Sequence, residues 1–407
     1  MDMAARRQTI GIGVVGLLAT GMLINYVDRG NLSTAAPLIK DQLHLTNAQT
    51  GLLLSAFFWT YTPFQPVAGW LAERINPYRT LAIGVAIWSA ATALIGIAGG
   101  FLSLFVLRLL LGMGESAIFP CNAKLLARDL PPERLGSANG LIGVGQALGP
   151  AIGTFAGGML MASYGWRPVF VLFGLISGLW LLPWIFVTRR ASARWATEPS
   201  LPPPSFLTIL GKRECWGASL GHFASNYALY FLITWLPLYL VKSRGFSMAE
   251  MSELGAMLYI LYAVSTQASG LLADRWMAAG ASSTKARKTI ITTGHLGVAA
   301  CMGVCALGGL TASMVGLVAS GLFFGMNTAT IFPIGQTLGG PRAAGKWMGV
   351  QNCLGNLAGV LAPVLTGYVV DWTGAFGLAF ALAAAISLIG IVGWVWIIRR
   401  VEVVDWA

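Results

Sequence analysis

Charged residues are scarce in this sequence. Asp, Glu, Lys and Arg make up 10% of the 407 residues, whereas soluble domains carry about 25%. Histidine occurs three times, and the five cysteines show no spacing that histidines would complete as a metal site. No nucleophile with a base and an orienting group is evident, nor is a phosphate-binding loop. We therefore expect neither a soluble domain nor an enzyme, and neither a metal nor a cofactor.

Hydrophobic residues make up 56% of the chain and gather in long segments. Each segment reaches the roughly 20 residues that a helix needs to cross a bilayer. The sequence therefore predicts an all-α polytopic membrane protein with twelve transmembrane helices. The expected spans are 9–37, 50–72, 79–98, 101–123, 136–162, 168–188, 214–241, 251–273, 288–307, 311–335, 346–370 and 375–398.

The cations between these spans are distributed unevenly. Twenty fall on one side of the predicted membrane, and only Lys40, Arg167, Lys242 and Arg244 fall on the other. Cytoplasmic loops are enriched in Lys and Arg, so we expect both termini in the cytoplasm and the protein in the inner (plasma) membrane. The net charge of +11 then reflects orientation in lipid, and nucleic acid is not an expected partner.

The two halves of the chain repeat each other. The segment from Gly69 to Arg74 recurs 201 residues later, and Asn139 and Pro150 recur 213 residues later as Asn352 and Pro363. Such a repeat predicts two pseudo-symmetric six-helix bundles with a site at midplane between them. We expect an N-terminal bundle at 1–188, a cytoplasmic linker at 189–213 and a C-terminal bundle at 214–407. One chain then holds both bundles, so a monomer should suffice.

Four charges lie inside the apolar spans. Asp28 and Arg29 are adjacent in the first span, and Arg108 and Glu115 lie seven residues apart in the fourth, close to two helical turns. A charge near the bilayer centre costs at least roughly 2.5–3.5 kcal/mol and usually marks an ion or substrate pathway. The alternative is a static ion pair within one span, although adjacent residues do not face each other on a helix.

These residues resemble those of a known superfamily. The segment from Gly69 to Arg74, followed by Arg79 and repeated after the eighth span, resembles the signature loop of the major facilitator superfamily. Within it, the chain is similar to the anion:cation symporter family, which includes bacterial galactonate and hexuronate transporters and the lysosomal sialic acid transporter. The stretches that carry this similarity, in a resemblance covering nearly the whole chain, are 26–33, 108–116 and 234–240. The loop departs from the usual pattern, in which an Asp and a Gly-Arg run are found where this chain has Glu73, Ile75 and Asn76. This departure concerns the gating latch of the family and not the substrate site.

The resemblance implies roles for the four buried charges. Arg29 would engage a substrate carboxylate, Asp28 and Glu115 would carry protons, and Arg108 would modulate Glu115. The residues themselves support this coupling, because the four charges together are neutral and an added anion would be uncompensated in a low dielectric. Protonation of one carboxylate leaves the site at +1, which suits a carboxylate ligand.

Polar side chains in other spans are candidates for lining the site. Tyr26, Tyr61 and Gln146 match positions that line a sugar-acid site in the resembled family. In the second half, amide and hydroxyl groups at helical spacing suit a polyhydroxylated acid. The alternative for all of them is hydrogen bonding between helices without ligand contact. The candidates in the second half are Asn226, Tyr230, Asn352 and, less favoured, Asn356.

The repeated loops are candidates for a gate. Glu73 and Asp274 lie near helix ends beside Arg74, Arg79 and Arg275. We expect the two acids to pair with an arginine of the other half and to hold the outward-open state until the halves rock. The alternative is that these loop charges set topology only. The arginines considered as partners are Arg79, Arg128, Arg134 and Arg342.

The expected function is proton-coupled import of an organic monoanion, a sugar acid such as an aldonate or uronate, by rocker-switch alternating access. Its partners would be this anion, protons and membrane lipid. The same fold importing aromatic or other small carboxylates is one alternative. A proton-driven antiporter that exports compounds is another alternative. The spacing of Gly145, Gly149, Gly153 and Gly157 resembles a motif of such antiporters, although this chain has Thr154 where the motif has its last glycine.

Overall fold

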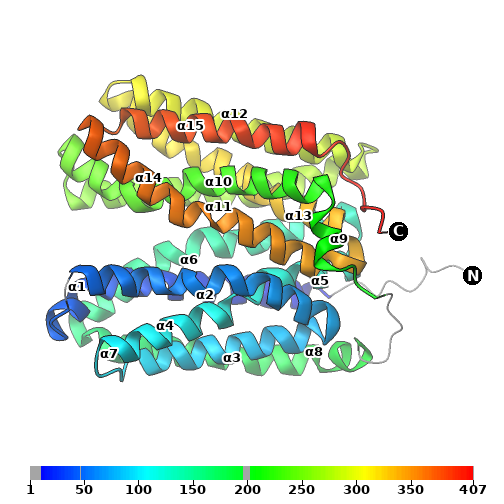
Figure 1. The fold of residues 1–407 in the computed structure, drawn as a ribbon, viewed down its shortest axis with the longest axis horizontal. Helices are drawn as coiled ribbons and strands as arrows, with labels where there is room; N and C mark the ends of the chain where they lie inside the picture. Colours follow the sequence, from blue (N-terminus) through cyan, green and yellow to red (C-terminus); the bar gives the residue numbers. More distant parts are fainter. Residues whose placement is uncertain (1–10, 46, 196–201, 407) are drawn as a thin grey trace, which may run out of the picture. The chain divides into compact units, whose positions relative to one another are not determined.

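The computed structural model describes residues 11–45, 47–195 and 202–406, and within these ranges it contains helices and no strand. Arg6 and Arg7, two of the cations used to predict orientation, lie outside the described residues. The helices are α1 (Ile12–Gln42), α2 (Asn47–Arg74), α3 (Pro77–Ile95), α4 (Phe101–Glu115), α5 (Ile118–Asp129), α6 (Leu135–Tyr164), α7 (Trp166–Leu179), α8 (Leu181–Trp195), α9 (Phe206–Leu210), α10 (Arg213–Leu238), α11 (Met248–Ala278), α12 (Ser283–Leu307), α13 (Leu310–Asn356), α14 (Ala358–Thr373) and α15 (Gly377–Ile391) (Figure 1).

The helices coincide with the predicted spans. Eight helical stretches of the described chain are long and apolar enough to cross a membrane by length and composition. One of them, Leu310–Thr373, holds two predicted spans, because α13 turns at Gly340, whose φ of 58° no helix interior adopts. Two other spans consist of two consecutive helices each, α4 with α5 and α7 with α8.

The chain forms two compact units that follow its two halves except at two short segments. Unit 1 comprises Met1–Leu130, Gly145–Pro203 and Pro341–Gly349, and unit 2 comprises Pro131–Val144, Pro204–Gly340 and Val350–Ala407. Each unit therefore includes a segment from the opposite half of the sequence. The predicted contiguous bundles did not anticipate this exchange.

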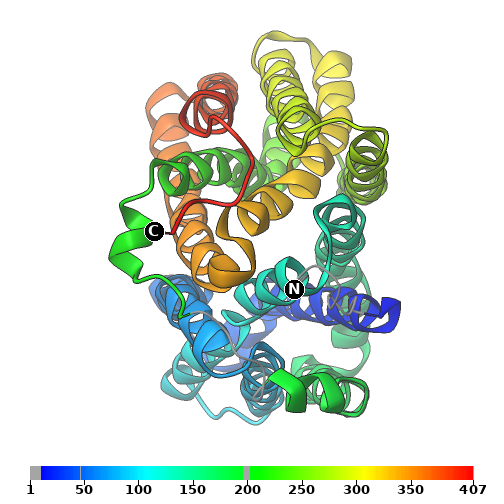
Figure 2. The ribbon, with the colours of Figure 1, turned by 90° about the vertical axis from the view of Figure 1, so that its right-hand side faces the viewer.

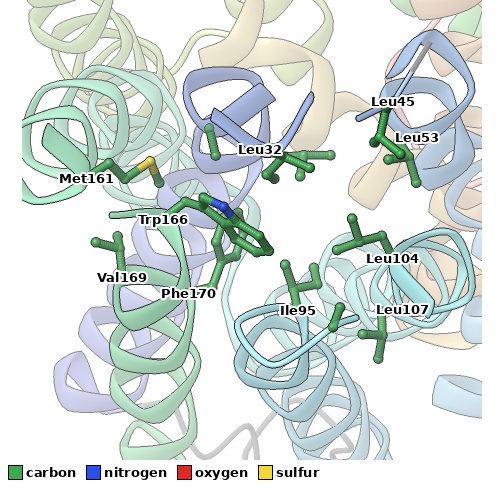
Figure 3. Packing of buried hydrophobic residues seen from close by; sticks show 13 residues of the cluster. Leu32, Leu45, Leu53, Ile95, Leu104, Leu107, Met161, Trp166, Val169 and Phe170 are labelled. Carbon is green, nitrogen blue, oxygen red and sulfur yellow. The ribbon is translucent and has the colours of Figure 1, made fainter. Parts of the chain in front are cut away.

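An apolar cluster closes one end of unit 1. Buried side chains from α1, α2, α3, α4, α6 and α7 meet there around Trp166 and Phe170, which are 2% exposed (Figure 3). Trp166 also donates its indole N–H to the side-chain oxygen of Gln42 at 2.6 Å. This cluster fixes the ends of the helices that carry the buried charges.

Glycines bring α6 against α1. A Cβ on Gly145 would lie 2.6 Å from the carbonyl oxygen of Ala19, and one on Gly153 would lie 2.5 Å from that of Val27. A Cβ on Gly149 would lie 2.5 Å from the Cβ of Tyr26. Backbones this close set the direction of the α1 side chains.

Replacing Gly153 by Val is expected to destabilise unit 1 by about 1–3 kcal/mol, because the new side chain must push α6 away from Val27. Thermal unfolding of the purified protein in detergent measures this change. Gly158→Ala is the matched control, since its Cβ would make an ordinary contact at 3.5 Å with Thr34. Equal unfolding temperatures for the two variants would contradict the close approach.

In unit 2, α15 packs against both α10 and α12. The green α10 and the red α15 lie side by side in Figure 2. A Cβ on Gly393, which follows the end of α15 by two residues, would lie 2.5 Å from the carbonyl oxygen of Gly217 on α10, so the backbones touch here too. This contact holds α10, which carries two candidate site residues.

Candidate substrate and proton site

The centre of the site is an ion pair between two helices of unit 1. The Arg29 Nε, on α1, donates to Oε2 of Glu115, the last residue of α4, at 2.8 Å. The Glu115 side chain is fully buried, whereas 15% of the Arg29 side chain is exposed. Two of the four predicted charges are thus brought together, and the arginine is the more accessible partner.

Aromatic rings surround the Arg29 guanidinium. Its central carbon lies 4.5 Å from the ring centroid of Tyr26, 4.4 Å from that of Tyr61 and 5.1 Å from that of Phe57. Such cation–π contacts hold a guanidinium in place without neutralising its charge. Sequence reasoning missed Phe57, although it precedes Tyr61 by one helical turn and stacks on it at 4.8 Å.

A glycine near the end of α4 allows this arrangement. A Cβ on Gly112 would lie 2.5 Å from the Thr60 hydroxyl oxygen of α2. That hydroxyl donates to the Leu109 carbonyl at 2.7 Å and ties the two helices together. The end of α4, with Glu115, therefore lies close to the α2 face that carries Phe57 and Tyr61.

Arg108 lies close to the pair but, among the described residues, forms no ion pair within its own helix. It is 6% exposed, and its guanidinium carbon is 5.2 Å from the Phe57 ring centroid. Its charge acts on both Glu115 and Arg29. No ion pair among the described residues joins Arg108 to Glu115, so the static pair within α4 that we considered is not observed.

Asp28 faces another part of unit 1. It is 2% exposed and accepts a hydrogen bond from the Ser177 hydroxyl of α7 at 3.0 Å. It takes part in none of the ion pairs between described residues. The alternative of a static Asp28–Arg29 pair is therefore wrong, because the helix directs the two neighbouring side chains to different faces. Sequence reasoning also missed Ser177, whose only signal is its place beside glycine in an apolar span.

Two further predicted residues present polar atoms in unit 1. The Tyr61 hydroxyl and the Gln146 side-chain oxygen are buried, and neither has a hydrogen-bond partner among the described residues. Gln146 lies on α6 between Gly145 and Gly149, which contact α1. Buried polar atoms of this kind usually have a partner, so both remain candidates for ligand contact.

The predicted residues of the second half meet within unit 2. Asn226 of α10 donates its amide to the Gly355 carbonyl at 3.1 Å, and the Tyr230 hydroxyl donates to the Asn356 side chain at 2.7 Å. Asn352, one turn before Asn356, is 2% exposed. The structure thus shows hydrogen bonds between α10 and α13, which is one of the two roles considered for these residues.

The acids of the repeated loops bind partners other than those predicted. In unit 1, Glu73 is bonded to the ammonium of Lys124 and accepts the Gly345 N–H at 2.7 Å. In unit 2, Asp274 accepts the N–H groups of Gly136 at 2.9 Å and Ser137 at 2.6 Å. The arginine partners we expected are wrong for both acids, because backbone N–H groups at helix starts attract carboxylates as cations do.

The arginines of these loops lie outside the contacts. Arg74, Arg79 and Arg275 are exposed. Arg128 pairs with Asp129 at 3.5 Å instead.

Burial raises the pKa of the Glu73 carboxyl above its usual value, and Lys124 lowers it in part. Lys124, which we had counted as a loop cation, is 6% exposed and belongs to the contact.

The two contacts repeat each other in detail. A Cβ on Gly69 would lie 2.5 Å from the Gly345 carbonyl oxygen, and a Cβ on Gly136 would lie 2.5 Å from that of Gly270. In each unit, a loop glycine thus packs on a glycine of the opposite half of the sequence, and the loop acid accepts N–H groups there. The predicted repeat is therefore visible as two equivalent helix contacts.

Buried charges within a helical membrane fold are typical of a membrane transporter, and comparisons with known proteins agree. The Major Facilitator Superfamily pattern matches residues 18–363. The chain belongs to the major facilitator superfamily, and its relatives place it with the anion:cation symporters.

Two of these relatives and one solved structure show how far the similarity reaches. The chain is 32% identical to the hexuronate transporter of Bacillus subtilis over 92% of each protein. It is 28% identical to the D-galactonate transporter of Escherichia coli O6:H1 over 94% of each. The human organic anion transporter MFSD10 has the same fold, with a TM-score of 0.76 at 15% identity, over 94% of this chain and 99% of that one. The predicted fold class is confirmed, and so is the expectation that the chain is a transporter and not an enzyme.

Proposed function

We propose that the protein is a proton-coupled symporter that imports an organic monoanion by alternating access. The observation that carries this proposal is the buried Arg29–Glu115 pair at 2.8 Å. A guanidinium is suited to bind a carboxylate through two parallel hydrogen bonds. In the structure the Arg29 Nε donates to one oxygen of Glu115, so a substrate carboxylate at Arg29 would compete with Glu115 for its charge.

A proton resolves this competition. Two carboxylates beside one guanidinium leave an uncompensated negative charge, which is costly in a low dielectric. Protonation of Glu115 removes its charge and frees Arg29 for the anion. Binding of the proton and binding of the anion therefore favour each other, which is the linkage that symport requires.

We propose a sugar acid, an aldonate or uronate, as the substrate. The names of the two relatives above specify sugar acids, and both proteins match this chain along nearly its full length. The Tyr61 hydroxyl and the Gln146 amide oxygen, both buried, suit a polyhydroxylated ligand. The polar side chains of α10 and α13 remain candidates for hydrogen bonds to the hydroxyl groups of such a ligand.

An aromatic carboxylate is the second candidate. The three rings around Arg29 favour it, since they offer flat apolar surfaces beside the anchor for a carboxylate. Competition decides between the candidates: unlabelled galacturonate, galactonate and benzoate are compared for inhibition of labelled uptake. Inhibition by benzoate alone would reject the sugar-acid substrate.

Uptake into proteoliposomes tests the proposed function. An inward pH gradient and a membrane potential are imposed separately, with labelled sugar acid outside. Accumulation driven by the pH gradient supports symport, and a response to potential alone indicates that more protons than anions cross. Loss of accumulation when the lumen is made acidic is also expected. Uptake driven by an acidic lumen would instead establish the antiporter.

We propose that the protein works as a monomer in the inner (plasma) membrane, with both termini cytoplasmic. We also propose that the loop contacts form its gate.

Replacing Glu73 by Gln is expected to slow uptake at least about tenfold, because Lys124 loses its buried counter-charge. Initial uptake rates measure this effect, with Arg79→Gln, an exposed loop charge, as the control. Equal rates for the two variants would mean that these charges set topology only.

A further inference from the structure

The surroundings of Asp28 differ from those of the other three buried charges. A Cβ on Gly174 of α7 would lie 2.7 Å from the Ala93 Cα of α3, so the two backbones touch. Ser177 follows Gly174 by three residues on α7 and is 1% exposed. Its hydroxyl donates to Oδ2 of Asp28 at 3.0 Å. The seam between α3 and α7 thus presents a hydroxyl to a carboxyl of α1.

Among the described residues, the groups that act on Asp28 from its neighbouring helices are two hydroxyls and one acid. Thr92 of α3 is buried beside it, and Glu115 of α4 is the charged group that acts on it. Helix α6 carries no charged residue. Helix α7 carries one cation, Arg167. It lies about three turns from Ser177 and donates to the carbonyls of Gly96 and Ala98.

A hydroxyl suits a carboxyl that changes its protonation state. It can donate to the ionised form and accept from the neutral form, whereas a guanidinium can only donate. An arginine partner would therefore hold Asp28 ionised, but Ser177 supports both forms in one place. Because no cation pairs with Asp28 in the described structure, a proton there is not in competition with the substrate at Arg29.

We propose that Ser177 is a positioning residue that holds Asp28 as a proton acceptor apart from the substrate-binding arginine. This inference rests on the proposed function, in which two acids serve one anion. It separates their tasks: Glu115 competes directly with the substrate, and Asp28 holds a proton that travels without touching it. Ser177 acts through Asp28 and does not contact the anion.

The test replaces Ser177 by Ala and compares it with Ser89→Ala. Ser89 is a buried serine of α3 on the same seam, and its hydroxyl has no hydrogen-bond partner among the described residues. Uptake driven by a pH gradient is measured as a function of pH, beside exchange of labelled for unlabelled substrate at equal pH. Exchange needs no net release of protons, so it reports folding and substrate binding.

We expect Ser177→Ala to move the pH of half-maximal uptake upward by about one unit. The hydroxyl donates to the carboxylate, and a hydrogen bond to a charged group is stronger than one to a neutral group. Exchange should stay within about twofold of wild type, since Arg29 and Glu115 are untouched. Ser89→Ala should leave both measurements unchanged. An unmoved pH profile in Ser177→Ala, or an equal shift in Ser89→Ala, would overturn the inference.

Infrared difference spectroscopy separates this inference from the proposed function. Acidification should produce a carboxylic acid C=O band that is absent in Asp28→Asn and displaced in Ser177→Ala but not in Ser89→Ala. If this band behaves as expected while wild type shows no uptake driven by a pH gradient, the symport proposal fails and the assignment of Ser177 stands. A band that Ser177→Ala leaves in place would reject the assignment whatever the uptake shows.

Discussion

Arg29→Ala is expected to lower uptake about 100-fold or more. The guanidinium supplies charge-assisted hydrogen bonds to the anion, and truncating one partner of such a buried pair costs about 2–5 kcal/mol. Glu115 would also lose its bonded cation. Initial rates in proteoliposomes at several substrate concentrations measure the loss as a fall in Vmax/KM.

Arg29→Lys refines this prediction. Lysine keeps the positive charge but lacks the planar fork that binds a carboxylate bidentately, so we expect an intermediate loss of about tenfold. Arg342→Ala is the control, since Arg342 binds only the Pro202 carbonyl among the hydrogen bonds of the described residues. Wild-type uptake by Arg29→Ala would show that the ion pair is structural.

Glu115→Gln is expected to abolish accumulation driven by a pH gradient while leaving exchange of substrate measurable. Glutamine cannot take up a proton, and it leaves Arg29 without a competing carboxylate. The anion then binds without a proton, and the linkage between the two is lost. Parallel assays of gradient-driven uptake and of exchange at equal pH separate these effects.

The same two assays would also reveal results that contradict the prediction for Glu115→Gln. If Glu115→Gln accumulates substrate as well as wild type, protonation of Glu115 is not part of the cycle. If it loses exchange together with accumulation, the substitution has damaged substrate binding. Asp28→Asn provides a comparison, because Asp28 lies apart from Arg29 and its loss should leave exchange closer to wild type.

Much of the fold could be predicted because it depends on the length of apolar segments. The spans follow from the roughly 20 residues that lipid requires, and the halves follow from the repeat of Gly69 to Arg74 at Gly270. The four buried charges could be found for the same reason, since each interrupts an apolar span. Their pairing could not, because Arg29 and Glu115 are 86 residues apart and meet only through helix packing.

Most of the remaining differences arise where a partner has no charge. Asp274 binds backbone N–H groups, and Glu73 binds one beside its ion pair with Lys124. Every residue except proline carries such an N–H, so no side chain marks it in the sequence. Ser177 and Phe57 are ordinary residues for a membrane helix and gain their roles from Asp28 and Arg29. Matching opposite charges in the sequence therefore predicted arginine partners for two acids that bind N–H groups at helix starts.

The exchange of segments between the units bears on how the chain is made. Unit 1 includes Pro341–Gly349, so it remains incomplete while the ribosome synthesises most of the second half. During that time Gly69 has no backbone to pack on, and Glu73 lacks the Gly345 N–H that it binds in the finished protein. The nascent first half must tolerate this bare surface in the membrane. If the loop contacts form the gate, as we propose, transport would uncover the same surface again in every cycle.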